Sequence, residues 1–167
     1  PDGYTVLVTT NATIVINPQI FTKVVKYDPV KDFSPISLLA SQPLVLVVHP
    51  SMPVKTVPEL IALARAKPGT LNFASSGSGG SAHLAGEMLK SMANINMTYV
   101  PYKGSAPALV ALLGGEINFM FTAILTAMPL VEQNRLRAIA VSKGKEIGRA
   151  QARLTRRTCW FVRRAAR

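Results

Sequence analysis

Two loops rich in small polar residues could bind an anion, because each leaves a strand-like segment and enters a helix-like one. At a helix N-terminus, unpaired backbone N–H groups and the positive end of the helix dipole attract negative charge. Glycine lets the backbone approach the anion closely, and serine hydroxyls add donors. The candidate residues are Ser75, Ser76, Gly77, Ser78, Gly79 and Ser81 in the first loop and Tyr102, Lys103, Gly104, Ser105 and Ala106 in the second. Together they predict a site for a small carboxylate, with Tyr102 and Lys103 at its rim.

Two other interpretations of the first loop stay open. The run from Gly77 to Ala82 fits G-x-G-x-x-A, the dinucleotide fingerprint. Segment 96–104 lacks the acid that would bind a ribose, although Lys103 could meet a 2′-phosphate, so an NADP-binding oxidoreductase fragment using Gly77–Ser81 is one alternative. A P-loop is excluded because Ser81-Ala82 replaces its Lys-Ser/Thr pair. Glycine and serine can also simply form a tight turn between a strand and a helix.

No other residue set favours catalysis or metal binding. His49 and His83 are not accompanied by carboxylates or thiols with metal-ligand spacing, and no G-x-S-x-G occurs. We therefore expect no metal, no cofactor and no enzymatic activity. His83 lies in the first turn of the helix behind the first loop, where packing or bracing of the loop is favoured over ligand contact.

Composition and charge separate the body of the chain from its C-terminal segment. With 167 residues, 49% of them hydrophobic, the chain suits one globular core. Nine of its 19 Lys and Arg residues but only one of its eight Asp and Glu residues lie in 143–167, so the net charge of +11 belongs largely to that segment. The body has no basic stripe with interleaved aromatic residues, and we expect no nucleic acid partner. A basic-tailed interaction protein is the third interpretation.

The sequence as given contains no recognisable targeting segment, and its cysteine content does not identify a cellular compartment. No apolar run is long enough to cross a membrane, and no signal peptide is recognisable. The single cysteine, Cys159, excludes an internal disulfide and leaves the redox compartment undetermined.

Hydrophobic periodicity predicts the elements that hold the loops in place. Strand-like runs at 4–10, 43–50, 71–75, 96–102, 117–121 and 136–142 alternate with helix-like runs at 56–67, 81–95, 105–115 and 126–134. Segment 17–36 is expected to be an irregular connection. Strands that alternate with helices indicate an α/β fold with a parallel-rich sheet flanked by helices.

Two further expectations concern the helices. Thr56 and Glu59 have the spacing of a capping box, and Ser105 is placed to cap a later helix. Met88 and Met92 share a helical side with other apolar residues, which predicts that both are buried.

Several segments resemble, in order and spacing, the substrate-binding receptors of tripartite tricarboxylate transporters, of the Bug/TctC type. The most specific are PDGYT at 1–5 and PYKG at 101–104, and the resemblance runs without a gap from residue 1 to about residue 142. It implies a periplasmic-binding-protein-like fold of type II, the Venus flytrap, whose two lobes close on a ligand. It also implies a periplasmic receptor, without catalytic role, that captures a di- or tricarboxylate or an aromatic carboxylate and presents it to membrane permease subunits.

The resemblance divides the chain and extends the predicted site. Residues 1–40 correspond to a remnant of the first lobe and the inter-lobe connection, and 41–142 correspond to the second α/β lobe. Thr122 stands where many relatives carry an acid near the ligand, so a simple carboxylate is favoured over an amino acid. The implied first-lobe contacts are Thr10, Asn11 and Thr13.

The chain departs from the family pattern at both ends. Relatives begin earlier, with first-lobe elements that are absent here, and they continue past 136–142 with a P-D-V-P-T type segment. Composition and resemblance change together after about Ser142, so we expect 143–167 to lie outside the family fold, as a reading-frame change would produce. A genuine basic tail is the alternative. We also expect the truncated chain to self-associate over the apolar surface that its missing lobe would cover.

Overall fold

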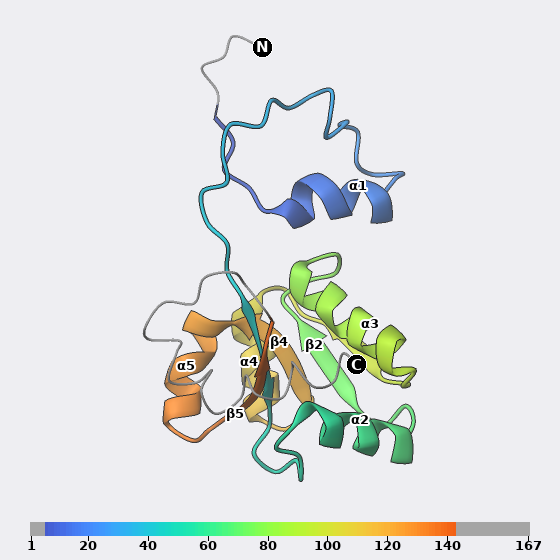
Figure 1. The fold of residues 1–167 in the computed structure, drawn as a ribbon, viewed down its shortest axis with the longest axis vertical. Coiled ribbons are helices and arrows are strands. Elements are labelled where there is room, and N and C mark those ends of the chain that lie inside the picture. The colour runs from blue at the N-terminus through green and yellow to red at the C-terminus, as the bar shows by residue number, and fades with distance from the viewer. Residues whose placement is uncertain (1–5, 143–167) are drawn as a thin grey trace.

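Five strands form one sheet in which their order differs from their order in the sequence. The computed structural model describes residues 6–142. The strands are β1 (Leu44–Val48), β2 (Asn72–Ser75), β3 (Thr98–Pro101), β4 (Phe119–Ala123) and β5 (Arg137–Val141), arranged β3-β2-β4-β1-β5. The helices between them are α2 (Val57–Ala66), α3 (Ser81–Ala93), α4 (Ser105–Leu113) and α5 (Ile124–Glu132). Figure 1 shows this body beneath an N-terminal segment, residues 6–40, that carries η1 (Ala12–Ile16) and α1 (Asn17–Ile20).

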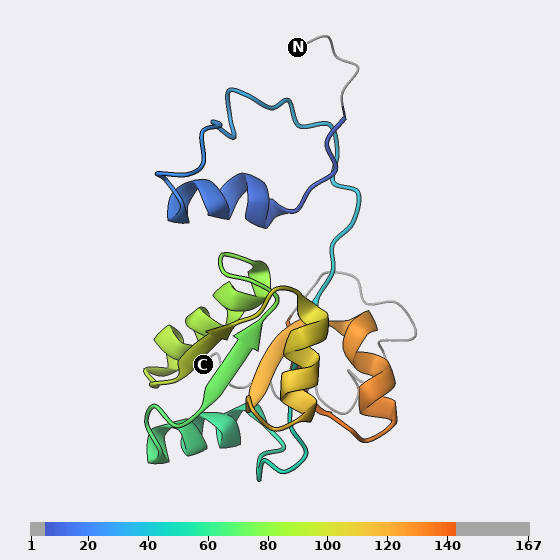
Figure 2. The ribbon, with the colours of Figure 1, turned by 180° about the vertical axis from the view of Figure 1, so that it is seen from behind.

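Helices cover both faces of the sheet, and the residues of β1 divide between the two cores. Leu46 and Val48 pack with α2 and α3, whereas Val45 and Val47 pack with α4 and α5. All four are buried, which explains why this segment is a continuous apolar run. Figure 2 shows α4 (yellow) in front of the sheet and α3 (light green) behind it. Within residues 6–142, no helix has both the length and the apolarity that a membrane span requires.

Four of the five strands point the same way, but the sheet is mixed, with two parallel and two antiparallel pairings, because β1 runs in the other direction. β2 pairs in parallel with β3 and β4, whereas β1 runs antiparallel to β4 and β5. β1 ends and β2 begins at the same edge, where Asn118 bonds to both: its carbonyl accepts from the His49 N–H and its N–H donates to the Asn72 carbonyl. The two strands must therefore run in opposite directions. Two strands joined by a helix are parallel only when the helix carries the chain back to the edge where the first strand begins. Here α2 leaves the chain at the edge where β1 ends.

The prediction that Met88 and Met92 are buried is wrong, since 60% and 82% of their surface is accessible. A Cβ atom added at Gly86 would lie 2.2 Å from Cε2 of Phe73, so α3 lies unusually close to the sheet. Such an approach admits only small residues on the buried side of the helix, and the longer apolar side chains point away. The buried residues of α3 are Ala82, Gly86 and Ala93.

The cap predicted for α2 at Thr56 is confirmed, and the hydrogen bond of the Glu59 carboxylate goes to Lys55, the residue before the cap. The Thr56 hydroxyl oxygen accepts the Glu59 N–H at 3.4 Å, and Glu59 Oε2 accepts the Lys55 N–H at 2.7 Å. The Lys55 N–H is the main cause that lowers the pKa of the Glu59 carboxyl below its ordinary value. The cap predicted at Ser105 is wrong: Gly104 is the N-cap of α4, and no side chain caps this end. With φ of +110°, Gly104 adopts a conformation that serine at that position would strain to reach.

We expect Thr56→Ala to lower the free energy of unfolding by about 1 kcal/mol, because it removes the oxygen that caps α2. Chemical denaturation would measure the change. Thr126→Ala, at an exposed position inside α5, is the matched control and is expected to leave stability unchanged or slightly raised. Equal losses in both variants would show that the cap makes no specific contribution.

The N-terminal segment differs from its sequence prediction. Residues 6–10 form no strand, because no strand within 6–142 offers them hydrogen-bonding partners. The first regular elements are η1 and α1, and α1 lies in the stretch expected to be irregular. The segment is held together by its own contacts: the Tyr27 hydroxyl donates to the Thr13 carbonyl, and the Tyr27 ring packs edge-to-face on Phe33 with centroids 5.5 Å apart.

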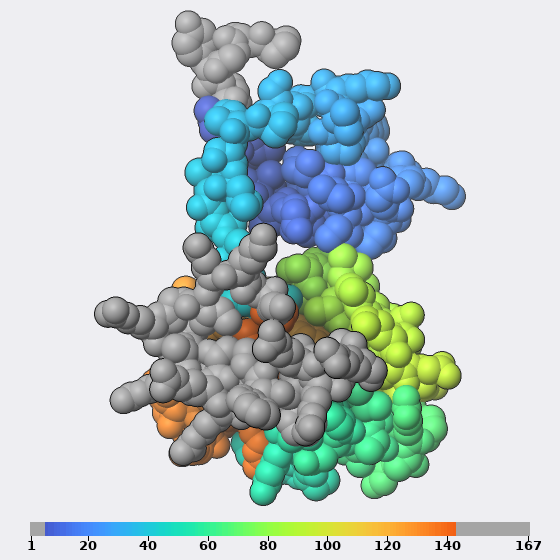
Figure 3. All heavy atoms as spheres, in the orientation of Figure 1, coloured from blue at the N-terminus to red at the C-terminus, as the bar shows by residue number. Residues whose placement is uncertain are grey.

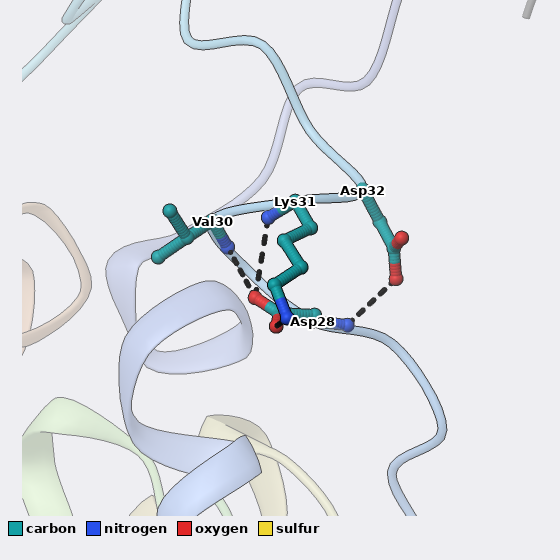
Figure 4. A network of polar contacts seen from close by, with 4 residues as sticks. All are labelled: Asp28, Val30, Lys31 and Asp32. Atoms are coloured by element: carbon teal, nitrogen blue, oxygen red, sulfur yellow. Dashed lines mark hydrogen bonds and ion pairs between the residues drawn. The ribbon is translucent and has the colours of Figure 1, made fainter.

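Asp28 organises a turn within the same segment (Figure 4). Its Oδ1 accepts the N–H groups of Val30 at 2.9 Å and Lys31 at 3.2 Å, and Asp32 Oδ2 accepts the Asp28 N–H at 2.7 Å. The Val30 and Lys31 donors lower the pKa of Asp28, since they stabilise the ionised carboxylate. The contribution of this group to stability is therefore complete above its ordinary pKa and is lost as the pH falls through the lowered one.

Candidate functional site

The two polar loops lie side by side where β2 and β3 end. Ser75 and Pro101 are partners at the last register position of these parallel strands. A hydrogen bond of 3.0 Å from the Gly104 N–H to the Ser76 carbonyl joins the loops directly. α3 and α4 begin immediately afterwards, so two helix N-termini meet at one edge of the sheet.

Ser75 holds the first loop from the inside. Its side chain is fully buried, and its hydroxyl donates to the Gly77 carbonyl at 2.8 Å and lies 2.9 Å from the Tyr99 hydroxyl. The Gly77 N–H donates back to the same oxygen at 3.3 Å. These bonds satisfy the hydroxyl, which therefore shapes the loop rather than presenting a free donor at its surface.

Tyr99 is a residue of this site that sequence reasoning missed. Its hydroxyl reaches Ser75 and, at 3.5 Å, the Ser78 hydroxyl. Its ring lies between those of Phe73 and His83, with centroids 5.2 and 4.1 Å away. Tyr99 is also the register partner of Phe73 on β2, which places it beneath the loop that follows β2. An aromatic residue inside a short strand carries no signal for this role, because the sequence does not say which strand lies beside it.

His83 braces the same loop, as the sequence indicated. Its Nδ1 accepts the Gly79 N–H at 3.2 Å, four residues earlier in the chain. Gly79 has φ of +77°, a conformation that other residues reach with strain. The loop backbone is therefore held on one side by Ser75 and on the other by His83.

The second loop contributes one cation and an open helix end. Lys103 is exposed, and within residues 6–142 no carboxylate forms an ion pair with it. Tyr102 is half-buried and packs against the core beneath α4 and α5. Ser105 and Ala106 form the first turn of α4, whose leading N–H groups have no helical acceptor.

The N-terminal segment closes over the first loop at Gly79. A Cβ atom at Gly79 would lie 2.9 Å from Asn17 Oδ1 and 3.2 Å from Cε2 of Phe21. Figure 3 shows the atoms of this segment (blue) meeting those at the start of α3 (green). The predicted first-lobe residues Thr10, Asn11 and Thr13 lie at the start of η1, and within the described residues no hydrogen bond joins them to either loop.

Thr122 is a buried polar residue with an unfilled hydrogen-bonding capacity. It lies on β4 just before α5, it is 3% exposed, and its hydroxyl has no partner within residues 6–142. An unpaired buried hydroxyl is costly, so most such groups have a partner in native proteins. In the described part of the chain no three His, Cys, Asp or Glu side chains gather as a metal site would require.

The fold and the site define a class of protein. A sheet covered by helices on both faces, with polar loops where parallel strands end and helices begin, is the arrangement of an α/β domain that binds small ligands at the carboxyl ends of its strands. The family model of the tripartite tricarboxylate transporter family receptor matches residues 1–154. The chain belongs to this family. The match includes 143–154, part of the segment expected to lie outside the family fold, and the whole of 143–167 lies outside the described residues.

Proteins of known sequence or structure are similar to this chain. The "UPF0065 protein in tcbD-tcbE intergenic region" of Pseudomonas sp. (strain P51) is 36% identical over 141 residues, which are 84% of this chain and 41% of that protein. The structure of R. palustris Rpa4515 with adipate is 38% identical, with a TM-score of 0.66 over 72% of this chain and 40% of that one. MatC (Rpa3494) from Rhodopseudomonas palustris with bound malate is 26% identical, with a TM-score of 0.71 over 88% of this chain and 49% of that one. The chain thus spans less than half the length of these relatives.

Proposed function

We propose that this chain is part of a periplasmic receptor that binds a small carboxylated solute for a tripartite tricarboxylate transporter and has no enzymatic role. The observation that carries the proposal is the hydrogen bond between Gly104 and Ser76, which joins the loops that open α3 and α4. Two helix N-termini at one place offer several N–H donors and two positive dipole ends to a single carboxylate. Membership of the family, together with relatives bound to adipate and malate, supports the same class of ligand.

The donors already in use narrow the contacts available to a carboxylate. The N–H groups of Gly77 and Gly79 donate to Ser75 and His83, so they are not free for a ligand. The donors that remain are the N–H groups and hydroxyls at the starts of α3 and α4. We propose that Lys103 adds its charge at the rim. The proposed contacts are Ser76, Ser78, Ser81, Ser105 and Ala106.

A second carboxylate of the solute would meet the N-terminal segment. Asn17 and Phe21 already pack on the first loop, so the segment lies within reach of a ligand held there. Its start carries the hydroxyl and amide groups of Thr10, Asn11 and Thr13. The unpaired hydroxyl of Thr122 supplies no negative charge, which favours a simple carboxylate over a ligand bearing an amino group.

A dinucleotide fits the geometry less well. In the fingerprint, the second glycine lets a pyrophosphate approach the backbone, and Gly79 occupies that position. Asn17 and Phe21 cover Gly79, and its N–H is bonded to His83. These contacts favour the receptor over the NADP-binding alternative.

We expect a thermal melt of the chain to shift upward with adipate or malate and to stay unchanged with NADPH. Ligand at a hundred times its Kd adds about 2.7 kcal/mol to the free energy of unfolding. Ser78→Asp is expected to abolish the shift, because it places a negative charge among the donors. Ser91→Asp, exposed near the other end of α3, is the matched control and should keep it. A shift with NADPH alone would replace the receptor with the oxidoreductase interpretation.

We propose that the chain by itself self-associates, while the full-length receptor docks on the permease subunits of its transporter. Apolar side chains of the N-terminal segment are exposed, among them Leu38 and Leu39. Surface of this kind is ordinarily covered by another chain or domain. Size-exclusion chromatography with light scattering should show a dimer or larger species, and the double variant Leu38→Ser, Leu39→Ser should move it toward monomer. A monomer at every concentration for the parent chain would contradict this expectation.

A further inference from the structure

The helices of this protein differ in the charge carried by their first turns. α2 has Glu59 in its first turn, whereas α3, α4 and α5 have no acid there. The three helices without an acid follow β2, β3 and β4, which end at the edge that holds the candidate site, and α2 follows β1, which ends at the opposite edge. An acid in the first turn ordinarily stabilises a helix, since it offsets the dipole and accepts an orphan N–H. The first turns of α3, α4 and α5, which lie at one edge of the sheet, lack this stabilising acid, and the candidate anion site at that edge supplies a physical reason.

His83 takes the place of that acid in α3. In α2, Glu59 Oε2 accepts the N–H of Lys55, four residues earlier, at 2.7 Å. In α3, His83 Nδ1 accepts the N–H of Gly79, again four residues earlier, at 3.2 Å. The two helices use the same side-chain-to-backbone bond, with a charged acceptor in α2 and a neutral one in α3. An imidazole nitrogen that accepts a hydrogen bond brings no negative charge to the loop, unlike the Glu59 carboxylate.

The imidazole is held in this orientation by its neighbours. Its ring packs against that of Tyr99 in a tilted arrangement, with centroids 4.1 Å apart and an interplanar angle of 37°. The Tyr99 hydroxyl in turn bonds to Ser75 and reaches Ser78 in the same loop. The acceptor, the aromatic support and the loop backbone thus form one connected unit.

We propose that His83 is a positioning and specificity-determining residue, which holds the Gly79 N–H in place of a capping carboxylate and so keeps negative charge out of an anion site. The inference rests on the proposed function for the identity of the ligand. Glutamate at this position would hold the loop as Glu59 holds the start of α2, but it would repel a bound carboxylate. Charge and structural support therefore make opposite demands on residue 83, and a neutral acceptor meets both.

Three variants of the full 167-residue chain separate these demands. His83→Gln keeps a neutral acceptor, His83→Glu keeps the acceptor and adds charge, and His83→Phe keeps a ring but removes the acceptor. At pH 8, calorimetric titration with adipate and with malate would give Kd, and amide hydrogen exchange at Gly79 would report whether its N–H is hydrogen-bonded.

We expect His83→Gln to bind within about three-fold of the parent chain, since one neutral hydrogen bond is exchanged for another. His83→Glu should protect Gly79 and retain its melting temperature, yet bind at least about ten-fold more weakly. His83→Phe should lose the protection of Gly79 and bind about five- to ten-fold more weakly.

The outcomes distinguish this inference from the proposed function. Binding by His83→Glu as tight as that of the parent chain would overturn the charge argument and leave the receptor function intact. Unchanged exchange at Gly79 in His83→Phe would overturn the bracing role, whether or not a ligand binds. If neither adipate nor malate binds the parent chain, the specificity role fails together with the proposed function, and Gly79 exchange still decides the bracing role. If His83→Phe does not fold, the comparison of His83→Gln with His83→Glu decides the charge argument.

Discussion

Replacing Phe73 with alanine is expected to lower the free energy of unfolding by about 3–5 kcal/mol. The ring is fully buried in β2, stacks on Phe119 with centroids 5.7 Å apart and lies 5.2 Å from Tyr99. Its loss removes these contacts and leaves a cavity that the backbone of α3 cannot fill without moving. Chemical denaturation, followed by circular dichroism, would measure the change.

Phe21→Ala is the matched control, since it removes the same ring from a position that is 37% exposed. We expect this control to lose far less stability, because less apolar surface returns to water. A loss below about 1 kcal/mol for Phe73→Ala would contradict the packing described for β2. Because Phe73 also supports Tyr99, the variant should weaken any carboxylate binding as well as the fold.

Gly86→Ala has the second large expected effect on the free energy of unfolding. Helix propensity predicts that this free energy rises, whereas packing predicts that it falls. Alanine is the better helix former by about 1 kcal/mol, so propensity alone predicts a gain in stability. Packing predicts a loss, because the new Cβ would lie 2.2 Å from Cε2 of Phe73 and 2.6 Å from its Cδ2. Overpacking costs about 1–3 kcal/mol, and a 2.2 Å contact belongs at the upper end of that range, so after the propensity gain is subtracted we expect a net loss of about 1–2 kcal/mol, measured by the same denaturation experiment.

Gly114→Ala tests whether the loss at Gly86 comes from the contact with Phe73. At Gly114, the end of α4, φ is −78° and a Cβ atom would meet its nearest neighbour at an ordinary 3.5 Å. We expect this variant to be neutral or slightly stabilised. In the double variant Phe73→Ala, Gly86→Ala the cost of the added methyl should disappear, because the ring it meets is gone. Purely additive effects would show that the two residues do not interact.

Local patterns predicted much of this fold from the sequence alone. The continuous apolar run around β1 indicated a strand buried on both faces, and the spacing of Thr56 and Glu59 indicated the start of α2. Both are short-range features, in which neighbouring residues interact through the backbone that they share. The family was likewise recognisable from the motifs at 1–5 and 101–104.

The candidate site was predicted only in part, because its residues depend on partners far away in the chain. The two loops were recognisable as turns before helices, yet the sequence did not show that the Gly79 N–H is already bonded to His83. Tyr99 was missed because its role depends on lying beside β2. That these loops bind a carboxylate stays a prediction.

The sequence by itself determined the elements from β1 to β5, the capping of α2 and the presence of glycine and serine where strands turn into helices, but it did not determine those of the N-terminal segment. Tertiary structure alone decided the direction of β1, the exposure of Met88 and Met92 and the support of the first loop by Tyr99. Periodicity and capping act within one or two helical turns, so they can be read locally. Strand direction and burial depend on which segments meet in space, and the close approach of α3 to Phe73 reversed the side of the helix that hydrophobic periodicity predicts to be buried.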